Sequence, residues 1–136
     1  MLYNGSTRQT AIWYMHNNVY AGGAYGPILP AGWSLIDVAD FNRDGNNDYA
    51  LFNSSTRQTA IWYLSGNILI GSVAGPTVPS GWVLVATGEF NGDGKPDFVI
   101  YKPSTSQTGV WYLNNNVYAG SALGPILPAG WTLVAP

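Results

Sequence analysis

The sequence of 136 residues contains no cysteine, which excludes disulfides and thiol chemistry. Charged residues make up only 9% of the chain and the net charge is -2, whereas about a quarter of a typical soluble domain is charged. No apolar run approaches the roughly 18 residues that a transmembrane helix needs, and no signal-peptide pattern is visible after Met1. We therefore expect neither nucleic acid nor a membrane as a partner.

The chain also lacks any segment with a helical stripe of apolar residues. Its 17 Gly and 9 Pro interrupt the sequence too often for helices of ordinary length. Short runs rich in β-branched and aromatic residues lie between them, which is typical of strands. In the middle of the chain we predict four strands: Trp33 to Ala39, Tyr49 to Asn53, Thr59 to Leu64 and Asn67 to Val73. The stretch from Gly75-Pro76 to Gly81 is predicted to link one four-stranded unit to the next.

What the sequence does contain is an internal repeat of 49 residues without insertion or deletion. The copies span residues 2–50, 51–99 and 100–136, and we treat residues 1–136 as one repeat domain. The third copy ends before the counterparts of Ala39 to Ala50. All six tryptophans fall into two series with this spacing, Trp13, Trp62 and Trp111 in one and Trp33, Trp82 and Trp131 in the other. Such a repeat indicates one supersecondary unit that buries its faces against copies of itself.

The predicted strands are apolar on both faces, as in Ala60 to Leu64 and Val83 to Ala86. Both faces of each sheet must therefore be covered. Stacked blades of four antiparallel strands meet this requirement, so we predict an all-β fold made of β-propeller blades. The alternative is a β-sandwich of roughly twelve strands, which gives no reason for a constant repeat length.

About three blades are expected per chain, whereas propellers typically have 4–8. We therefore expect the ring to be completed by oligomerisation, with a homodimer forming six blades and a trimer, with nine, as the alternative. In this arrangement Trp131 to Ala135 of each chain would pair beside Leu2 to Asn4 of its partner.

Six of the seven acidic residues lie in two equivalent loops, 40–48 and 89–97. Oxygen-bearing side chains occupy positions 1, 3, 5 and 9, glycine occupies position 6, and position 7 would offer its main-chain carbonyl. Calcium takes six to eight hard oxygen ligands, and alternate residues of a tight loop converge on one point. The candidate ligands are Asp40, Asn42, Asp44, Asn46 and Asp48 in the first loop and Glu89, Asn91, Asp93, Lys95 and Asp97 in the second.

Loops of this composition have three other interpretations. A turn rich in Asp, Asn and Gly needs no metal, because such side chains bond their own backbone. An EF-hand is excluded because its position 12 would fall at Leu51 or Ile100, inside a predicted strand. Magnesium suits the loops less well because it prefers compact octahedral shells with retained water.

The stretches DFNRDGNND and EFNGDGKPD, each between two strands, resemble the calcium loops of FG-GAP/VCBS-type propeller repeats. The resemblance extends in register over the chain. It implies Ca2+ ligands at Asp40, Asn42, Asp44 and Asp48, and at Glu89, Asn91, Asp93 and Asp97, although Glu89 replaces the usual Asp. It also implies an extracellular module, lectin-like in some members, that binds glycans or proteins.

The two tryptophan series are expected to lie in the core, and stacking against sugar rings is the alternative. His16, the sole histidine, is interpreted as a turn residue. No catalytic constellation can be argued from one histidine and carboxylates assigned to metal, so we do not expect an enzyme. Two functions remain open: a calcium-stabilised binding module for glycan or protein, and a structural or engineered propeller fragment that self-assembles without a ligand.

Overall fold

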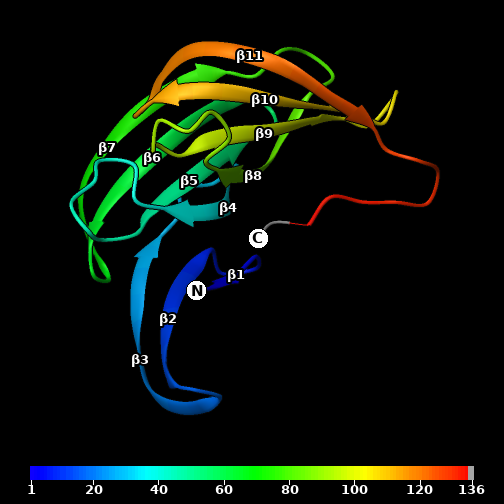
Figure 1. Cartoon of the computed structure of the whole chain (residues 1–136). Helices are drawn as coiled ribbons and strands as arrows, with labels where there is room; N and C mark the ends of the chain where they lie inside the picture. Colours follow the sequence, from blue (N-terminus) through cyan, green and yellow to red (C-terminus); the bar gives the residue numbers. More distant parts are fainter. Residues whose placement is uncertain (135–136) are drawn as a thin grey trace.

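The computed structural model describes residues 1–134 and confirms an all-β fold, with three antiparallel sheets and no helix in this range (Figure 1). The first sheet contains β1 (Leu2–Asn4), β2 (Gln9–His16) and β3 (Val19–Ile28). The second contains β4 (Trp33–Ala39), β5 (Asp48–Asn53), β6 (Gln58–Ser65) and β7 (Ile68–Thr77). The third contains β8 (Val83–Gly88), β9 (Asp97–Lys102), β10 (Gln107–Asn114) and β11 (Val117–Ile126). No helix of the described residues is long and apolar enough to cross a membrane.

Each sheet is a meander in which consecutive strands pair, and this is consistent with propeller blades. The strand predicted at Trp33 to Ala39 coincides with β4, and β5 and β6 are one or two residues longer than predicted. The prediction for the fourth strand was wrong at its end, because β7 continues to Thr77 through Gly75-Pro76. Since β7 is an edge strand, the missing N–H of Pro76 removes no hydrogen bond from a ladder.

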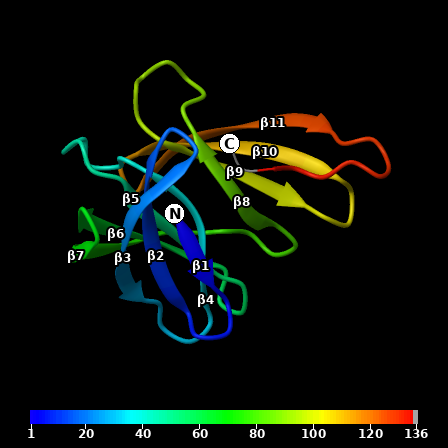
Figure 2. The same ribbon diagram turned by 90° about the horizontal axis from the view of Figure 1, so that it is seen from below.

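The sheets follow one another in space as they do in sequence, and the second lies between the other two (Figure 1). Seen from below, the first sheet overlaps the second, and the third extends to one side (Figure 2). We call the side of a sheet that faces the preceding sheet its upstream face, and the other side its downstream face. In the second sheet the upstream face carries Tyr49, Leu51 and Ala60, which form a core with Leu29 and Tyr3.

The downstream face of the second sheet builds the other core of the molecule. Ala50, Phe52 and Ile61 pack there against Phe98 and Ile100, which lie on the upstream face of the third sheet. Two surfaces consequently have no sheet of the described chain against them: the upstream face of the first sheet and the downstream face of the third.

A pair of side chains, repeated in every copy, holds the edge strand of each sheet in place. Gln58 donates through Nε2 to the carbonyl of Gly75 at 2.7 Å, and Thr59 donates through Oγ1 to that of Pro76 at 2.6 Å. The counterparts Gln9-Thr10 and Gln107-Thr108 make the same bonds in the other sheets. A Cβ on Gly75 would lie 2.5 Å from Thr59 Oγ1, which explains why glycine precedes proline at this point of β7.

The last described residues, Trp131 to Val134, form no strand in the single chain. The strand expected from Trp131 to Ala135 is therefore absent over residues 131–134, and Ala135 lies outside the described residues. The first sheet has three strands because no segment within residues 1–134 pairs with the free edge of β1. The pairing between chains stays a prediction.

Candidate functional site

The first acidic loop, residues 40–48, joins β4 to β5 and curls around its own main-chain N–H groups. Asp40 accepts through Oδ1 from the N–H of Asp44 at 3.1 Å and through Oδ2 from that of Gly45 at 2.9 Å. Asn42 Oδ1 accepts from the N–H of Asp44, and Asp44 Oδ1 from that of Asn46. Loop positions 1, 3 and 5 therefore direct their oxygens toward one short stretch of backbone, at the exposed end of the loop.

The backbone hydrogen bond from Asn46 lowers the pKa of Asp44 below its ordinary value, and the side-chain amides of Asn46 and Asn42 act in the same direction. Asn46 was expected to offer its carbonyl oxygen to a metal. In the structure its main-chain and side-chain N–H groups bond Asp44.

Asp48 ends the loop and is fully buried. Its Oδ2 accepts from the N–H groups of Phe41 and Asn42, at 3.0 and 3.4 Å, and its Oδ1 accepts from that of Leu64 at 3.1 Å. Burial raises the pKa of Asp48 although these donors oppose the shift. Asp48 thus ties the base of the loop to β6, apart from the exposed oxygens of positions 1, 3 and 5.

The second acidic loop, residues 89–97, repeats most of this geometry. Asn91 Oδ1 accepts from the N–H of Asp93, and Asp93 Oδ1 from that of Lys95. Asp97 is buried and bonds the N–H groups of Phe90 and Leu113, as Asp48 does for their counterparts. The departure is Glu89, whose longer side chain accepts from the N–H groups of Asn91 and Gly92.

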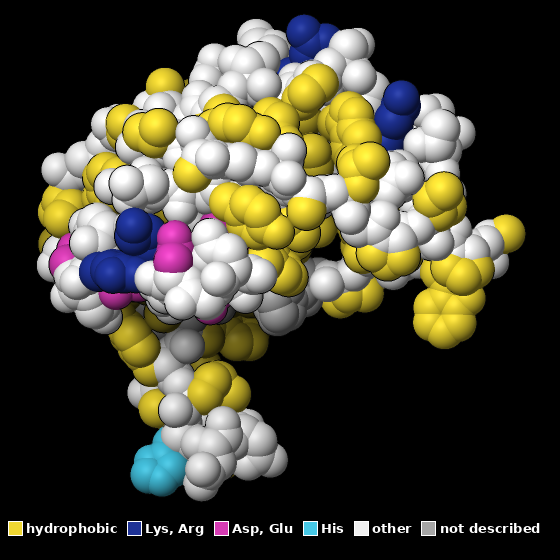
Figure 3. All heavy atoms as spheres, turned by 45° about the horizontal axis from the view of Figure 1, so that its top comes forward, with side chains coloured by type: hydrophobic (Ala, Val, Ile, Leu, Met, Phe, Trp, Pro, Cys, Tyr) yellow, Lys and Arg dark blue, Asp and Glu magenta, His cyan; other side chains and the backbone are white. Residues whose placement is uncertain are grey.

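The two loops are neighbours at the same end of the second and third sheets. Arg43 of the first loop donates to the main-chain carbonyl of Asp93 in the second at 2.6 Å. On the face shown in Figure 3, the acidic side chains lie beside basic ones in one area, other basic side chains lie apart from it, and most of the surface is uncharged. The counterpart of Arg43 is Gly92, so this link occurs once among the repeats.

Tryptophan grooves form a second repeated feature, on the upstream faces of the sheets. In the second sheet Trp33, Trp62, Ser72 and Pro30 line a cavity of about 390 Å³. Trp62 pairs with Ser72 across β6 and β7, and Trp33 begins β4. In the first sheet a smaller cavity of about 210 Å³ is lined by Trp13 and Gly23, the counterparts of Trp62 and Ser72, and also by Tyr20.

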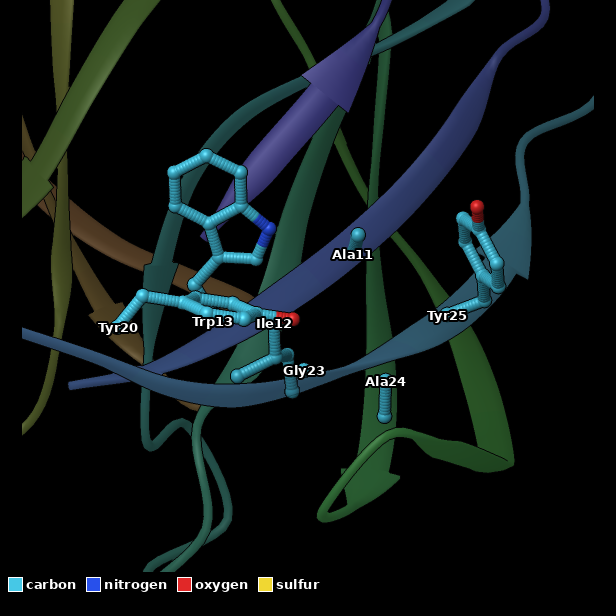
Figure 4. Close-up of a pocket in the computed structure, with 7 residues that line it drawn as sticks. All are labelled: Ala11, Ile12, Trp13, Tyr20, Gly23, Ala24 and Tyr25. Atoms are coloured by element: carbon cyan, nitrogen blue, oxygen red, sulfur yellow. The ribbon is translucent and has the colours of Figure 1, made fainter.

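Figure 4 shows Trp13 and Tyr25 standing on one side of the first sheet with Ala11 between them, while Ile12 and Ala24 point to the other side. Trp13 contacts Tyr20 edge to face, with ring centroids 5.5 Å apart. The third sheet repeats this contact between Trp111 and Tyr118 at 5.2 Å.

The expectation that the tryptophans lie in the core was wrong for Trp13, which is 55% exposed, and for Trp131, which is 70% exposed. The other four are half-buried and pack against the core clusters. The neighbouring inner strands β4 and β8 contact each other closely, whereas the outer strands of adjacent sheets make fewer contacts. The sheets therefore diverge outward and leave the tryptophan faces partly open.

Comparison with known proteins yields two matches to family descriptions. An FG-GAP-like repeat matches residues 40–100, and an FG-GAP repeat matches residues 81–121. Together they cover more than half of the chain, including both acidic loops. The chain belongs to the FG-GAP repeat family. No curated protein and no solved structure gave a significant match.

The carboxylate and amide oxygens of these FG-GAP loops are of the type that a hard cation prefers. Their positions match those of a cation site only in part. Within residues 1–134 no three His, Cys, Asp or Glu side chains form a cluster that could hold a metal ion. In the first loop the amide of Asn42 donates to Asp44 Oδ2, and loop N–H groups occupy the oxygens of Asp40. The side chains at positions 1, 3 and 5 must therefore exchange these N–H donors for an ion, whereas Asp48 already has three donors in place.

Several contacts of the FG-GAP repeats escaped the sequence analysis although their residues repeat. Gln58 and Thr59 recur in all three copies, and that recurrence was the available signal for the edge-strand bonds. Asn67 donates to the carbonyl of Tyr25 in the preceding sheet at 2.8 Å, and its counterpart Asn116 donates to the carbonyl of Ala74 at 3.1 Å. The sequence shows the recurring asparagine, but its acceptor is a main-chain atom and leaves no trace in the sequence.

Proposed function

We propose that the chain is a calcium-stabilised β-propeller module that binds glycans, in the manner of a lectin, at its repeated tryptophan grooves. The observation that carries the proposal is the groove between Trp33 and Trp62, because the counterparts of Trp62 and Ser72 also line a cavity of the first sheet. A sugar ring offers a flat C–H face and a rim of hydroxyl groups. An aromatic wall with a few polar groups beside it suits such a ligand.

The burial of the groove residues supports this role. Trp33 and Trp62 each keep part of the indole accessible while the rest packs on the core around Leu51 and Ala60. An aromatic side chain held in this way is fixed before a ligand arrives, and little conformational entropy is lost on binding. Ser72 places a hydroxyl group on the same side of the sheet, opposite Trp62.

Calcium would be held by Asp40, Asn42 and Asp44 in the first loop and by Glu89, Asn91 and Asp93 in the second, with Asp48 and Asp97 at the base of each loop. The ion would neutralise carboxylates that otherwise repel one another and would fix the exposed end of the loop. Glu89 reaches different N–H groups from Asp40, so we expect the two sites to differ in affinity. The proposal assigns no reaction to the chain.

A glycan array with the calcium-loaded protein tests the function. We expect a restricted set of glycans to bind, and Trp62→Ala to weaken that binding by about tenfold or more, since truncating a tryptophan at the centre of a binding site commonly costs about 2 kcal/mol or more. Ile70→Ala is the matched control, because Ile70 is exposed on β7 and lies outside the groove. An array with no bound glycan, or equal binding by Trp62→Ala and the wild type, contradicts the proposal. Capture of a protein ligand or self-assembly alone would then be the function to pursue.

A further inference from the structure

The downstream face of the third sheet carries side chains that are covered at the same positions of the second sheet. Phe41 is 2% exposed beneath the third sheet, where it contacts Phe98, whereas its counterpart Phe90 is 51% exposed. An apolar cavity of about 560 Å³ opens beside Phe90, lined by Val99, Val110 and Leu127 among others. These three are the counterparts of Ala50, Ile61 and Val78, which are all buried.

The upstream face of the first sheet is the matching half of this unfilled interface. Leu2 and Met15 are 38% and 50% exposed, whereas their counterparts Leu51 and Leu64 are 1% and 0% exposed under the first sheet. Each exposed face therefore has the composition of a face that the same chain buries elsewhere.

The hydrogen bonds between sheets identify what belongs on these faces. Asn67 and Asn116 each donate to a carbonyl on the preceding sheet, at Tyr25 and Ala74. Asn18 is the counterpart of these two residues in the first sheet. The carbonyl at the corresponding position of a preceding sheet is that of Leu123, so Asn18 would donate to it. Leu123 is on the edge strand of the third sheet and 74% exposed, and neither half of the pair is bonded to the other within residues 1–134.

A further contact between two sheets indicates the same occupant. Tyr63 donates through its hydroxyl to Asn115 Oδ1 on the following sheet at 2.7 Å. Tyr112 on the third sheet is the counterpart of Tyr63. Its acceptor on a following sheet would be the counterpart of Asn115, which is Asn17 of a first sheet. Asn17 has φ 56° and Asn115 has φ 58°, so the two turns present the side chain from the same backbone conformation.

We propose that a second copy of this chain docks head to tail, the downstream face of the third sheet of one copy on the upstream face of the first sheet of the other. The segment after Leu127 then continues as the first strand of the partner's first sheet. The pairing of β4 with β5 sets the register, because Trp33 pairs with Asn53 and Leu35 with Leu51. Trp131 therefore lies opposite Asn4 of the other copy, and Leu133 opposite Leu2.

Docking also completes a groove that one chain cannot build. The groove at Trp62 needs Pro30 and Trp33 as its second wall. At Trp13 the counterparts of that wall are Pro128 and Trp131, and the second copy supplies both. The ligand of this composite groove rests on the proposed function, whereas the docking itself does not.

Disulfide trapping tests the docking without any glycan, and the absence of native cysteine makes every disulfide an engineered one. Residues opposite each other in an antiparallel pair have Cα atoms about 4.5–5.5 Å apart, which a disulfide can span. We expect Leu2→Cys and Leu133→Cys, made as separate variants and then mixed, to form a covalent dimer under mild oxidation. The mixture of Leu2→Cys with Thr132→Cys is the matched control and should remain uncrosslinked, since residue 132 lies one position out of register.

Two results of the crosslinking experiment would overturn the proposal. If the mixture does not crosslink, while a double variant carrying both cysteines closes a disulfide within one chain, the tail folds onto its own first sheet and the proposal is wrong. If neither crosslinks although both variants fold by circular dichroism, the proposal is also wrong. As a second measurement, Asn18→Ala should weaken dimer formation by up to about tenfold, whereas Asn116→Ala should lower the melting temperature of the chain without changing dimer affinity. Equal dimer affinities of Asn18→Ala and the wild type would overturn the assigned contact.

Discussion

Asp37 on β4 accepts two hydrogen bonds from Thr87 on β8, one from its main-chain N–H at 2.8 Å and one from its hydroxyl at 2.9 Å. The bonds join the innermost strands of the second and third sheets. Asp37 is the one acidic residue outside the two loops, and its counterpart in the next copy is Ala86. The role of Asp37, which lies outside both loops, is therefore to join the second sheet to the third. No other pair of sheets within residues 1–134 has this contact, because the counterpart residue is an alanine.

We expect Asp37→Ala to lower the free energy of unfolding by about 1–3 kcal/mol, because it leaves two donors of the buried residue Thr87 without a partner. Thr87→Val removes only one of the two bonds and should cost less. Denaturant unfolding followed by circular dichroism measures both. A loss below about 0.5 kcal/mol for Asp37→Ala would show that water replaces the carboxylate.

Calcium should raise the melting temperature and a chelator should lower it. A ligand that binds only the folded state adds about 2.7 kcal/mol when present at 100 times its dissociation constant. Asp44→Ala should abolish part of the shift, Asp93→Ala another part, and the double variant all of it. Superimposable melting curves of the wild type in calcium and in chelator would refute the metal assignment.

Trp62→Ala should destabilise the chain by about 1.5–3 kcal/mol, less than the roughly 3–5 kcal/mol of a fully buried tryptophan. The reason is that Trp62 packs on the core with one side and leaves the other accessible. Thermal unfolding with and without a bound glycan separates the role of Trp62 in packing from its role in glycan binding. A loss of stability near about 5 kcal/mol would show that Trp62 acts as a core residue and not as part of a binding groove.

Gly75→Ala should be strongly destabilising because the new Cβ would lie 2.5 Å from Thr59 Oγ1. Thr59→Ala loses the bond to the carbonyl of Pro76 and should cost about 1 kcal/mol. In the double variant the hydroxyl that obstructs the methyl group is gone, so its cost should be smaller than the sum of the two single costs. Additive costs would mean that Gly75 is required for its backbone and not for the space beside Thr59.

The strand pattern could be predicted from the sequence because β-branched and aromatic runs such as Thr59 to Leu64 are separated by turn residues. The end of β7 could not, because Pro76 lies in a strand only where that strand is an edge. The loop positions were predicted from spacing, yet the burial of Asp48 depends on a donor at Leu64 that is distant in sequence. Trp13 and Trp62 carry the same local sequence but differ in exposure, since only one of them has a neighbouring sheet.

Native mass spectrometry of the calcium-loaded protein tests the account most directly, because it counts chains and ions together. We predict a species of two chains, with twice the 14.6 kDa of one chain. It should carry four calcium ions, two per chain. Two chains of three blades each would form a six-bladed ring. A trimer would indicate nine blades and contradict the two-copy ring. A single chain without bound calcium would contradict both the metal loops and the docking of a second copy.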